Sequence, residues 1–200
     1  MPDHRLPTDT DDGLLLIISG PSGVGKTTIT RGVERSIPGA VFSVSATTRA
    51  KTDADVEGLD YHFVTPDEFQ RMLDRAEFLE FAGVFGKRYG TPRAWVVEQL
   101  KRGRLVILEI DVQGAIQVKR QMSTAFAIFI LPPSEDVLLE RLRARKREPE
   151  DAIQRRFAEA RREMAVARES GVYDAFLVNR DVGAAIEEAV ELIQERRSRK

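Results

Sequence analysis

The sequence predicts a three-layer α/β fold, with a parallel central sheet, an inserted small mixed sheet and a helical lid. Three observations lead to this prediction. Short continuous apolar runs, typical of strands covered on both faces, recur along the chain. Segments with the apolar spacing of helices alternate with these runs. Between Ser45 and Thr91 the pattern changes to short strand-like segments separated by turn and charged residues, which indicates an insertion in the parallel core.

The strands of the core are read from their apolar runs. Leu14–Ser19 is the first, and Val106–Asp111 is a second that ends in acidic residues. A third covers Ala125–Leu131, where two prolines close it. We expect shorter strands at Phe176–Val178 and Phe42–Ser45.

The helices are predicted from their start signals and apolar spacing. One runs from Lys26 to Ser36 and stops near a proline. Thr65–Glu68 forms a capping box with proline at the first helical position, and Thr91-Pro92 repeats this start signal. Ser134 opens another helix with acidic residues in its first turn. An amphipathic helix at 184–199 ends the chain, and the longest apolar stripe comprises Ile153, Phe157, Ala160, Met164 and Ala167.

These elements suggest the following organisation. We expect residues 1–12 to be a disordered tail and residues 13–200 to be one domain. Its core would comprise 13–44, 92–132 and 165–200, with the insertion at 45–91 and the lid at 133–164.

Composition excludes several classes of protein. The chain of 200 residues has no cysteine, which rules out disulfides, cysteine zinc ligands and a thiol nucleophile, and its two histidines rule out a histidine-rich metal site. A net charge of −1 gives no global basic field for nucleic acid. No apolar run approaches the length of a membrane span, and the polar N-terminus does not resemble a signal or transit peptide. We therefore expect a cytoplasmic protein with no nucleic-acid or membrane partner.

The strongest motif follows the first strand. It has the spacing G-x-x-x-x-G-K-[ST] and consists of Gly20, Pro21, Ser22, Gly23, Val24, Gly25, Lys26 and Thr27, with Thr28 next in the helix. Its glycines let backbone N–H groups line a nest for phosphate, and the helix directs its positive end to the same place. Lys26 would reach the β- and γ-phosphates of ATP, and the Thr27 hydroxyl would bind Mg²⁺ directly or through water. The alternative is a glycine turn with an exposed lysine.

Two further groups of charged residues are candidates for the site. Glu109 and Asp111 end a predicted parallel strand, where ligands of such sheets bind, although they can also be solvated strand-end residues. Arginines crowd the segment 141–162. That segment can be a solvated face paired with nearby glutamates, a nucleic-acid patch that lacks interleaved aromatic residues, or a lid whose arginines clamp a transferring phosphoryl group.

The insertion contributes a specific series of motifs. After the phosphate loop come SVSATTR (43–49), DYHFV (60–64), FLE (78–80), YGT (89–91) and EIDVQG (109–114). Taken together and in this order, the series resembles guanylate kinases from about Leu14 to the end of the last helix. The resemblance implies a P-loop fold with an NMP-binding subdomain, and ATP- and Mg²⁺-dependent phosphorylation of GMP, with dGMP as a further acceptor.

The resemblance also implies roles for individual residues. Arg49, Tyr61 and Tyr89 would bind the phosphate of GMP. Glu80 would read guanine, with Ser45 and Thr91 also at the base and Asp111 beside the nucleotide. Arg145 and Arg156 would act with Lys26 in phosphoryl transfer, and Asn179 would lie near the adenine of ATP.

The chemistry of Glu80 agrees with this role. Guanine presents two donors on one edge, and a carboxylate, which only accepts, can take both. Adenine lacks both donors and would leave the carboxylate without partners, a mismatch that discriminates by about 10⁴ or more. Without the resemblance, Glu80 reads as a surface carboxylate, and Tyr61 and Tyr89 read as core tyrosines.

The chain departs from the family pattern at three positions. Thr52 replaces a second phosphate-binding arginine, Asp55 replaces a glutamate, and Lys146 replaces a glycine. Thr52 removes a bidentate fork, with only Lys51 beside it, so we expect weaker binding of GMP or preference for another acceptor. Two rival functions remain open: a kinase-like module that binds proteins, and a kinase for another small acceptor. The sequence leaves open a monomer or a homodimer.

Overall fold

The computed structural model describes residues 13–84, 86–144 and 149–198. Its central sheet has five parallel strands in the order β2-β7-β1-β8-β9. The strands are β1 (Leu14–Ser19), β2 (Val41–Phe42), β7 (Leu105–Glu109), β8 (Phe126–Leu131) and β9 (Ala175–Val178). The predicted fold class is confirmed.

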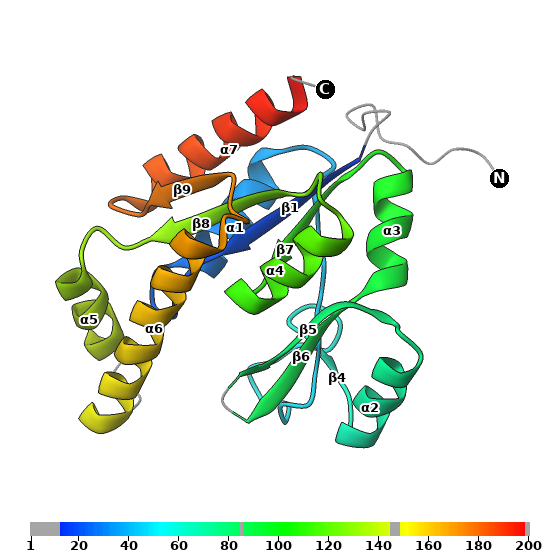
Figure 1. Cartoon of the computed structure of the whole chain (residues 1–200), viewed down its shortest axis with the longest axis horizontal. Helices are drawn as coiled ribbons and strands as arrows, with labels where there is room; N and C mark the ends of the chain where they lie inside the picture. Colours follow the sequence, from blue (N-terminus) through cyan, green and yellow to red (C-terminus); the bar gives the residue numbers. More distant parts are fainter. Residues whose placement is uncertain (1–12, 85, 145–148, 199–200) are drawn as a thin grey trace.

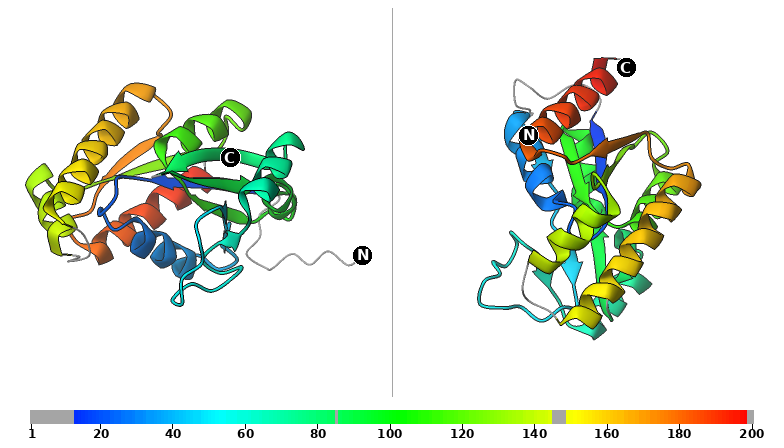
Figure 2. Two further views of the ribbon diagram at one scale, coloured as in Figure 1. Left: turned by 90° about the horizontal axis from the view of Figure 1, so that it is seen from below. Right: turned by 90° about the vertical axis from the view of Figure 1, so that its left-hand side faces the viewer.

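Helices cover both faces of this sheet, so that the molecule has three layers (Figure 2). Leu14, Leu16 and Ile18 of β1 pack towards α1 (Lys26–Ser36) and α7 (Val182–Ser198). Leu15 and Ile17 face the opposite cluster, which includes α4 (Val112–Gln121) and α6 (Glu150–Ser170). A strand buried on both faces needs apolar residues at every position, which explains the unbroken apolar run.

A second sheet of four strands lies below the core in Figure 1, with the order β4-β3-β6-β5. Its strands are β3 (Ala46–Thr47), β4 (His62–Phe63), β5 (Phe78–Val84) and β6 (Lys87–Pro92). The pairing β3–β4 is parallel, whereas β3–β6 and β5–β6 are antiparallel, so the sheet is mixed as predicted. Helix α2 (Pro66–Asp74) closes it by burying Phe69 against Phe78 and Ala46.

Helix α4 joins the two sheets. The Gln117 side chain donates to the carbonyl of Phe81 at 2.7 Å and accepts from its N–H at 3.2 Å. Gln121 donates to the carbonyl of Leu79 at 2.7 Å. Helix α3 (Arg93–Lys101) follows β6 directly and leads back to β7. On the other side of the core lie α5 (Glu135–Ala144) and α6 (Figure 1).

Several predicted boundaries were wrong, and two of them have informative causes. The strand predicted at 106–111 ends at Glu109, because Asp111 caps α4 and accepts from the N–H of Gly114 at 2.8 Å. Thr91 does not cap α3. It lies in β6, Pro92 occupies the N-cap without a side-chain bond, and the Thr91 hydroxyl donates to Glu80 instead.

The remaining start signals are borne out more closely. Thr65 accepts from the N–H of Glu68 at 3.1 Å, and Ser134 accepts from the N–H of Val137 at 3.2 Å. The strand predicted at 42–45 covers Val41–Phe42 instead, and the last helix begins at Val182 rather than at 184. The expected tail at 1–12 lies outside the described residues. Within the described part, no helix is both long and apolar enough to cross a membrane.

Candidate active site

The phosphate loop connects β1 to α1, as its motif requires. Gly25 stands at the N-cap of α1 with φ +97°, a left-handed conformation that suits glycine. A Cβ there would lie 2.7 Å from the amide nitrogen of Asn179. Lys26 folds back so that its ammonium donates to the carbonyls of Gly20 at 2.6 Å and Pro21 at 3.3 Å. The loop thus keeps a cation and the N-terminus of a helix at one end of the site.

Asn179, which follows β9, supports this loop by a hydrogen bond to its backbone. It is 1 % exposed, and its amide donates to the carbonyl of Val24 at 2.7 Å. Arg141 of α5 bonds the carbonyls of both Asn179, at 3.1 Å, and Val24, at 3.4 Å. The backbone of the loop is therefore held by two side chains distant in sequence. The predicted contact of Asn179 with adenine stays a prediction.

Acidic side chains at the ends of β7 face the loop. The Thr27 hydroxyl donates to Glu109 Oε1 at 2.7 Å, and Asp111 lies two residues further along the chain, at the N-cap of α4. Hydroxyl and carboxylate oxygens are ligands that Mg²⁺ accepts. No cluster of three or more acidic or histidine side chains suited to a metal occurs in the residues described. The Thr27 hydroxyl and the Glu109 carboxylate are oxygen donors of the kind that would suit a Mg²⁺ ion.

Glu80 lies at the opposite end of the site. It is 4 % exposed on β5, and the Thr91 hydroxyl donates to its Oε1 at 2.5 Å. Burial raises the pKa of Glu80 to about 7, against the effect of the Thr91 hydrogen bond, and the charge of Asp111 adds to the rise. A Cβ on Gly114 would lie 2.5 Å from Glu80 Oε2, so the glycine leaves room for the carboxylate.

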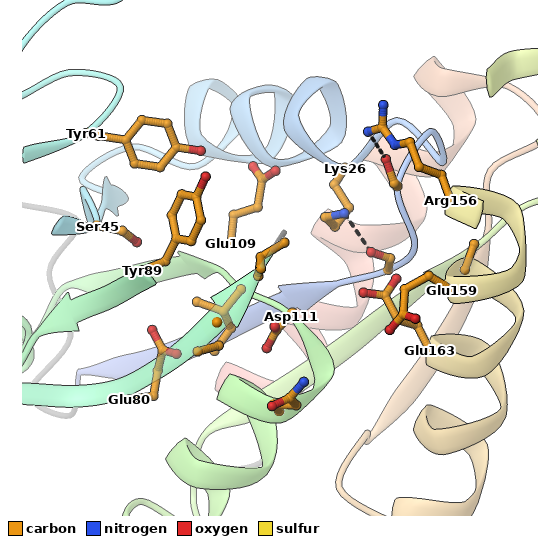
Figure 3. Close-up of a pocket in the computed structure, with 18 residues that line it drawn as sticks. Lys26, Ser45, Tyr61, Glu80, Tyr89, Glu109, Asp111, Arg156, Glu159 and Glu163 are labelled. Carbon is orange, nitrogen blue, oxygen red and sulfur yellow. Dashed lines mark hydrogen bonds between the residues drawn. The ribbon is translucent and has the colours of Figure 1, made fainter. Parts of the chain in front are cut away.

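Tyr61 and Tyr89 form an aromatic wall near Ser45. Their rings meet edge to face with centroids 5.6 Å apart, and both hydroxyls turn toward the cleft (Figure 3). Burial raises the pKa of Tyr61. The Arg49 guanidinium lies over the Tyr61 ring at 5.1 Å and is bound by both oxygens of Asp55, at 2.7 and 3.0 Å. That hydrogen bonding raises the pKa of Arg49.

Helix α6 supplies the remaining wall. Arg156 donates to the Ser22 hydroxyl at 2.6 Å, which brings one predicted arginine to the phosphate loop. Other arginines of the segment form exposed ion pairs that contribute little to stability: Arg143–Glu150, Arg155–Asp151, Arg161–Glu135 and Arg162–Glu159. The solvated-face interpretation therefore holds for those residues. The predictions for Arg145 and Lys146 lie outside the described residues.

A cleft of about 510 Å³ brings together predicted residues of the phosphate loop, the second sheet and α6 (Figure 3). The predicted residues that line it are Gly20, Ser22, Lys26, Ser45, Tyr61, Glu80, Tyr89, Glu109, Asp111 and Arg156. The predicted residues that do not line it are Pro21, Gly23, Val24, Gly25, Thr27, Thr28, Arg49, Thr91 and Asn179. Some of these residues support the cleft without lining it. Thr91 donates to Glu80, and Asn179 donates to the carbonyl of Val24 in the phosphate loop.

Glu163 is a residue of the site that no motif in the sequence indicates. The arginines and glutamates around it can be read as a solvated face, but Glu163 lines the cleft on α6. Burial raises its pKa to about 7, which the charge of Lys26 opposes and that of Asp111 favours. The spacing holds a signal for this placement, since Glu163 lies three residues after buried Ala160 and four before buried Ala167. Glu159 and Gln113 also line the cleft.

Comparison with known proteins agrees with this geometry. The family model described as guanylate kinase matches residues 13–196. A guanylate kinase of Gloeobacter violaceus is 47 % identical over 90 % of this chain and 87 % of that protein. A guanylate kinase of Symbiobacterium thermophilum is 43 % identical over 94 % of this chain and 87 % of that protein. A crystal structure of guanylate kinase from Anaplasma phagocytophilum superposes with a TM-score of 0.76 at 31 % identity, covering 94 % of this chain and 87 % of that one.

Proposed function

Since this chain belongs to the guanylate kinase family, we propose that it transfers the γ-phosphoryl group of ATP to GMP, giving ADP and GDP. The observation that carries the choice of acceptor is the buried pair of Glu80 and Thr91 at the end of the cleft away from the phosphate loop. We include dGMP as an acceptor.

Glu80 supports recognition of guanine through its hydrogen-bonding capacity. When ionised, its carboxylate accepts the N1–H and the exocyclic amine of guanine together. Thr91 already donates to Oε1 and restricts the rotation of the carboxylate. AMP presents neither donor, and binding it would leave a buried carboxylate without partners.

Phosphoryl transfer requires positioning and neutralisation of charge more than covalent chemistry. We propose that ATP occupies the phosphate loop and that the Lys26 ammonium exchanges its bonds to loop carbonyls for β- and γ-phosphate oxygens. Arg156, already at Ser22, stabilises the charge on the transferring group. The acceptor is a phosphate oxyanion, so no residue needs to remove a proton.

Magnesium belongs to this proposal as the partner of ATP. Thr27 and Glu109 are the residues that would hold it, directly or through water. When bound, Mg²⁺ supplies positive charge that neutralises the phosphate oxygens. We also propose a cytoplasmic protein, monomeric or homodimeric, that recycles GMP in purine nucleotide metabolism.

The two rival functions are less well supported. A module that only binds proteins has no need of an intact phosphate loop, and here the loop carries Lys26 and is supported by Asn179. A kinase for a different acceptor has no need of a buried acceptor-only group beside Thr91.

One assay tests the proposal. ADP release with ATP and Mg²⁺ is measured against GMP, dGMP, AMP, CMP and UMP, with wild type and with Lys26→Ala. Lys101→Ala, an exposed lysine at the end of α3, is the control. We expect turnover with guanine nucleotides only, lost in Lys26→Ala and retained in the control. No turnover with any acceptor, together with no thermal stabilisation by ATP and Mg²⁺, would support the binding module instead.

A further inference from the structure

Thr52 and Asp55, two of the three positions where the chain departs from the family pattern, are hydrogen-bonded to each other. Asp55 Oδ2 accepts from the backbone N–H of Thr52 at 2.7 Å and from its hydroxyl at 2.6 Å. The N–H of Asp55 in turn donates to the carbonyl of Thr52 at 3.1 Å. Residues 52–55 thus form a closed turn in which both donors of the threonine serve one carboxylate.

The same carboxylate holds Arg49. Oδ2 accepts from Arg49 Nη1 at 3.0 Å, and Oδ1 accepts from Nη2 at 2.7 Å. Four hydrogen bonds from two residues therefore converge on Asp55, and they hold the pKa of this carboxyl well below its usual range. Asp55 cannot rotate without breaking bonds to both Thr52 and Arg49.

The geometry leaves one edge of the guanidinium available. Arg49 has five N–H donors. Two of them go to the Asp55 carboxylate, and a third, on Nη1, goes to the carbonyl of Ala50 at 3.2 Å. Nε–H and the second proton of Nη2 have no acceptor within the described part of the chain. These two donors share one planar edge, which is the fork that binds phosphate in a bidentate manner. The rings of Tyr61 and Phe63, 5.1 and 5.3 Å from the guanidinium carbon, flank the group.

We propose that Thr52 and Asp55 are positioning residues for GMP, which hold Arg49 by one edge so that its other edge binds the phosphate. Thr52 is then more than a lost ligand. An arginine at position 52 would supply a second fork but no hydroxyl for Asp55, whereas threonine stabilises the single fork that the chain retains. The arrangement reduces the conformational entropy that Arg49 loses when it binds the anion. This inference rests on the proposed activity toward GMP.

The test compares a ligand that has the phosphate with one that lacks it. GMP and guanosine are each titrated by calorimetry into wild type, Asp55→Asn, Thr52→Val and Thr52→Ser. Asp53→Asn is the matched control, because it makes the same change of charge two residues away at an exposed position. Steady-state KM values for GMP and ATP are measured on the same proteins, and thermal unfolding checks that each is folded.

We expect Asp55→Asn to weaken GMP binding about tenfold and Thr52→Val about threefold to fivefold, as loss of hydrogen bonds to a charged group implies. Guanosine affinity, the KM for ATP and the behaviour of Asp53→Asn stay at wild-type values, and Thr52→Ser restores GMP binding. A purely structural role would instead weaken GMP and guanosine equally, which overturns the proposal.

Two other outcomes also overturn it. Tighter GMP binding in Asp55→Asn would mean that the aspartate withholds Arg49 from the phosphate. Unchanged GMP affinity in both Asp55→Asn and Thr52→Val would mean that Arg49 needs no support. In either case wild type still phosphorylates GMP, so the proposed function stands. A wild-type protein that neither binds nor phosphorylates GMP contradicts the activity and this inference together.

Discussion

Replacing Glu80 by glutamine separates the stability of the fold from recognition of guanine. The carboxyl group is 4 % exposed, and burial raises its pKa from 4.5 to about 7. In the unfolded chain the group loses its proton near 4.5. Between these values the folded protein binds more protons than the unfolded chain, so its stability falls as the pH rises.

The size of the effect follows from the same pKa values. The stability that the neutral carboxyl contributes is fully present below pH 4.5 and is lost as the pH rises to about 7. At about 1.4 kcal/mol for each pH unit, the free energy of unfolding falls by about 3 kcal/mol over this range. Glutamine has nearly the same shape, accepts from Thr91 and never ionises. Relative to wild type, Glu80→Gln should therefore gain up to about 3 kcal/mol in free energy of unfolding between pH 5 and pH 8.

Activity should change in the opposite direction. Glutamine offers guanine one acceptor and one donor where the carboxylate offers two acceptors. We expect kcat/KM for GMP to fall by about 10² or more, because each hydrogen bond to a charged group contributes about 1.5–3 kcal/mol. In wild type, affinity for GMP should rise as the pH increases through 7, since the ionised carboxylate is the better acceptor.

Urea unfolding at pH 5 and pH 8 measures the stability of wild type and Glu80→Gln without ligand. Glu77→Gln, an exposed carboxylate just before β5, is the control. The comparison isolates Glu80 because any other acid with a raised pKa, such as Glu163, is present in both proteins. If the pH dependence of unfolding is the same in wild type and Glu80→Gln, the argument from burial is wrong.

Three further predictions follow from the walls of the site. Asn179→Ala removes the hydrogen bond to the Val24 carbonyl, so we expect the free energy of unfolding in urea to fall by about 1–3 kcal/mol and the KM for ATP to rise. If both values stay unchanged, Asn179 does not support the loop. Gly114→Ala places a Cβ 2.5 Å from Glu80 Oε2, so the KM for GMP should rise about tenfold even though alanine is the better helix former. An unchanged KM would show that Glu80 can move at little cost. Glu163→Gln removes a carboxyl whose pKa burial raises to about 7, so unfolding at pH 8 should require more urea than in wild type, and the difference should be much smaller at pH 5. Equal midpoints at pH 8 would refute it.

The core strands and helices could be predicted because burial on two faces leaves an unbroken apolar run, and burial on one face leaves a helical stripe. The phosphate loop could be predicted for a similar reason, since the chemistry is local to GPSGVGKT. Thr91 shows where this reasoning stops. A Thr-Pro pair before a helix reads as a cap, but the hydroxyl goes to Glu80, a partner that only the pairing of β5 with β6 brings near.

Charged residues were the least predictable part of the site. Glu163 shares its charged sequence surroundings with Glu150, which forms an exposed ion pair with Arg143, but Glu163 faces the cleft from α6. Thr52 reads as a missing ligand because the bonds of a turn with Asp55 are not visible in the letters. In both cases the deciding fact is which way a polar side chain points, and composition carries little information on that.

Strand β5 stands last in its sheet, so its outer edge has no strand partner among the residues that the structure describes. Such an edge, with Phe81 46 % exposed on it, is a template for pairing with another chain. Gln117 fills both the N–H and the carbonyl of Phe81, and Gln121 takes the carbonyl of Leu79. The two glutamines thus protect the molecule against edge-to-edge aggregation. Helix α4 therefore has two separate roles, since its N-cap Asp111 lines the cleft while its glutamines cover the edge of β5.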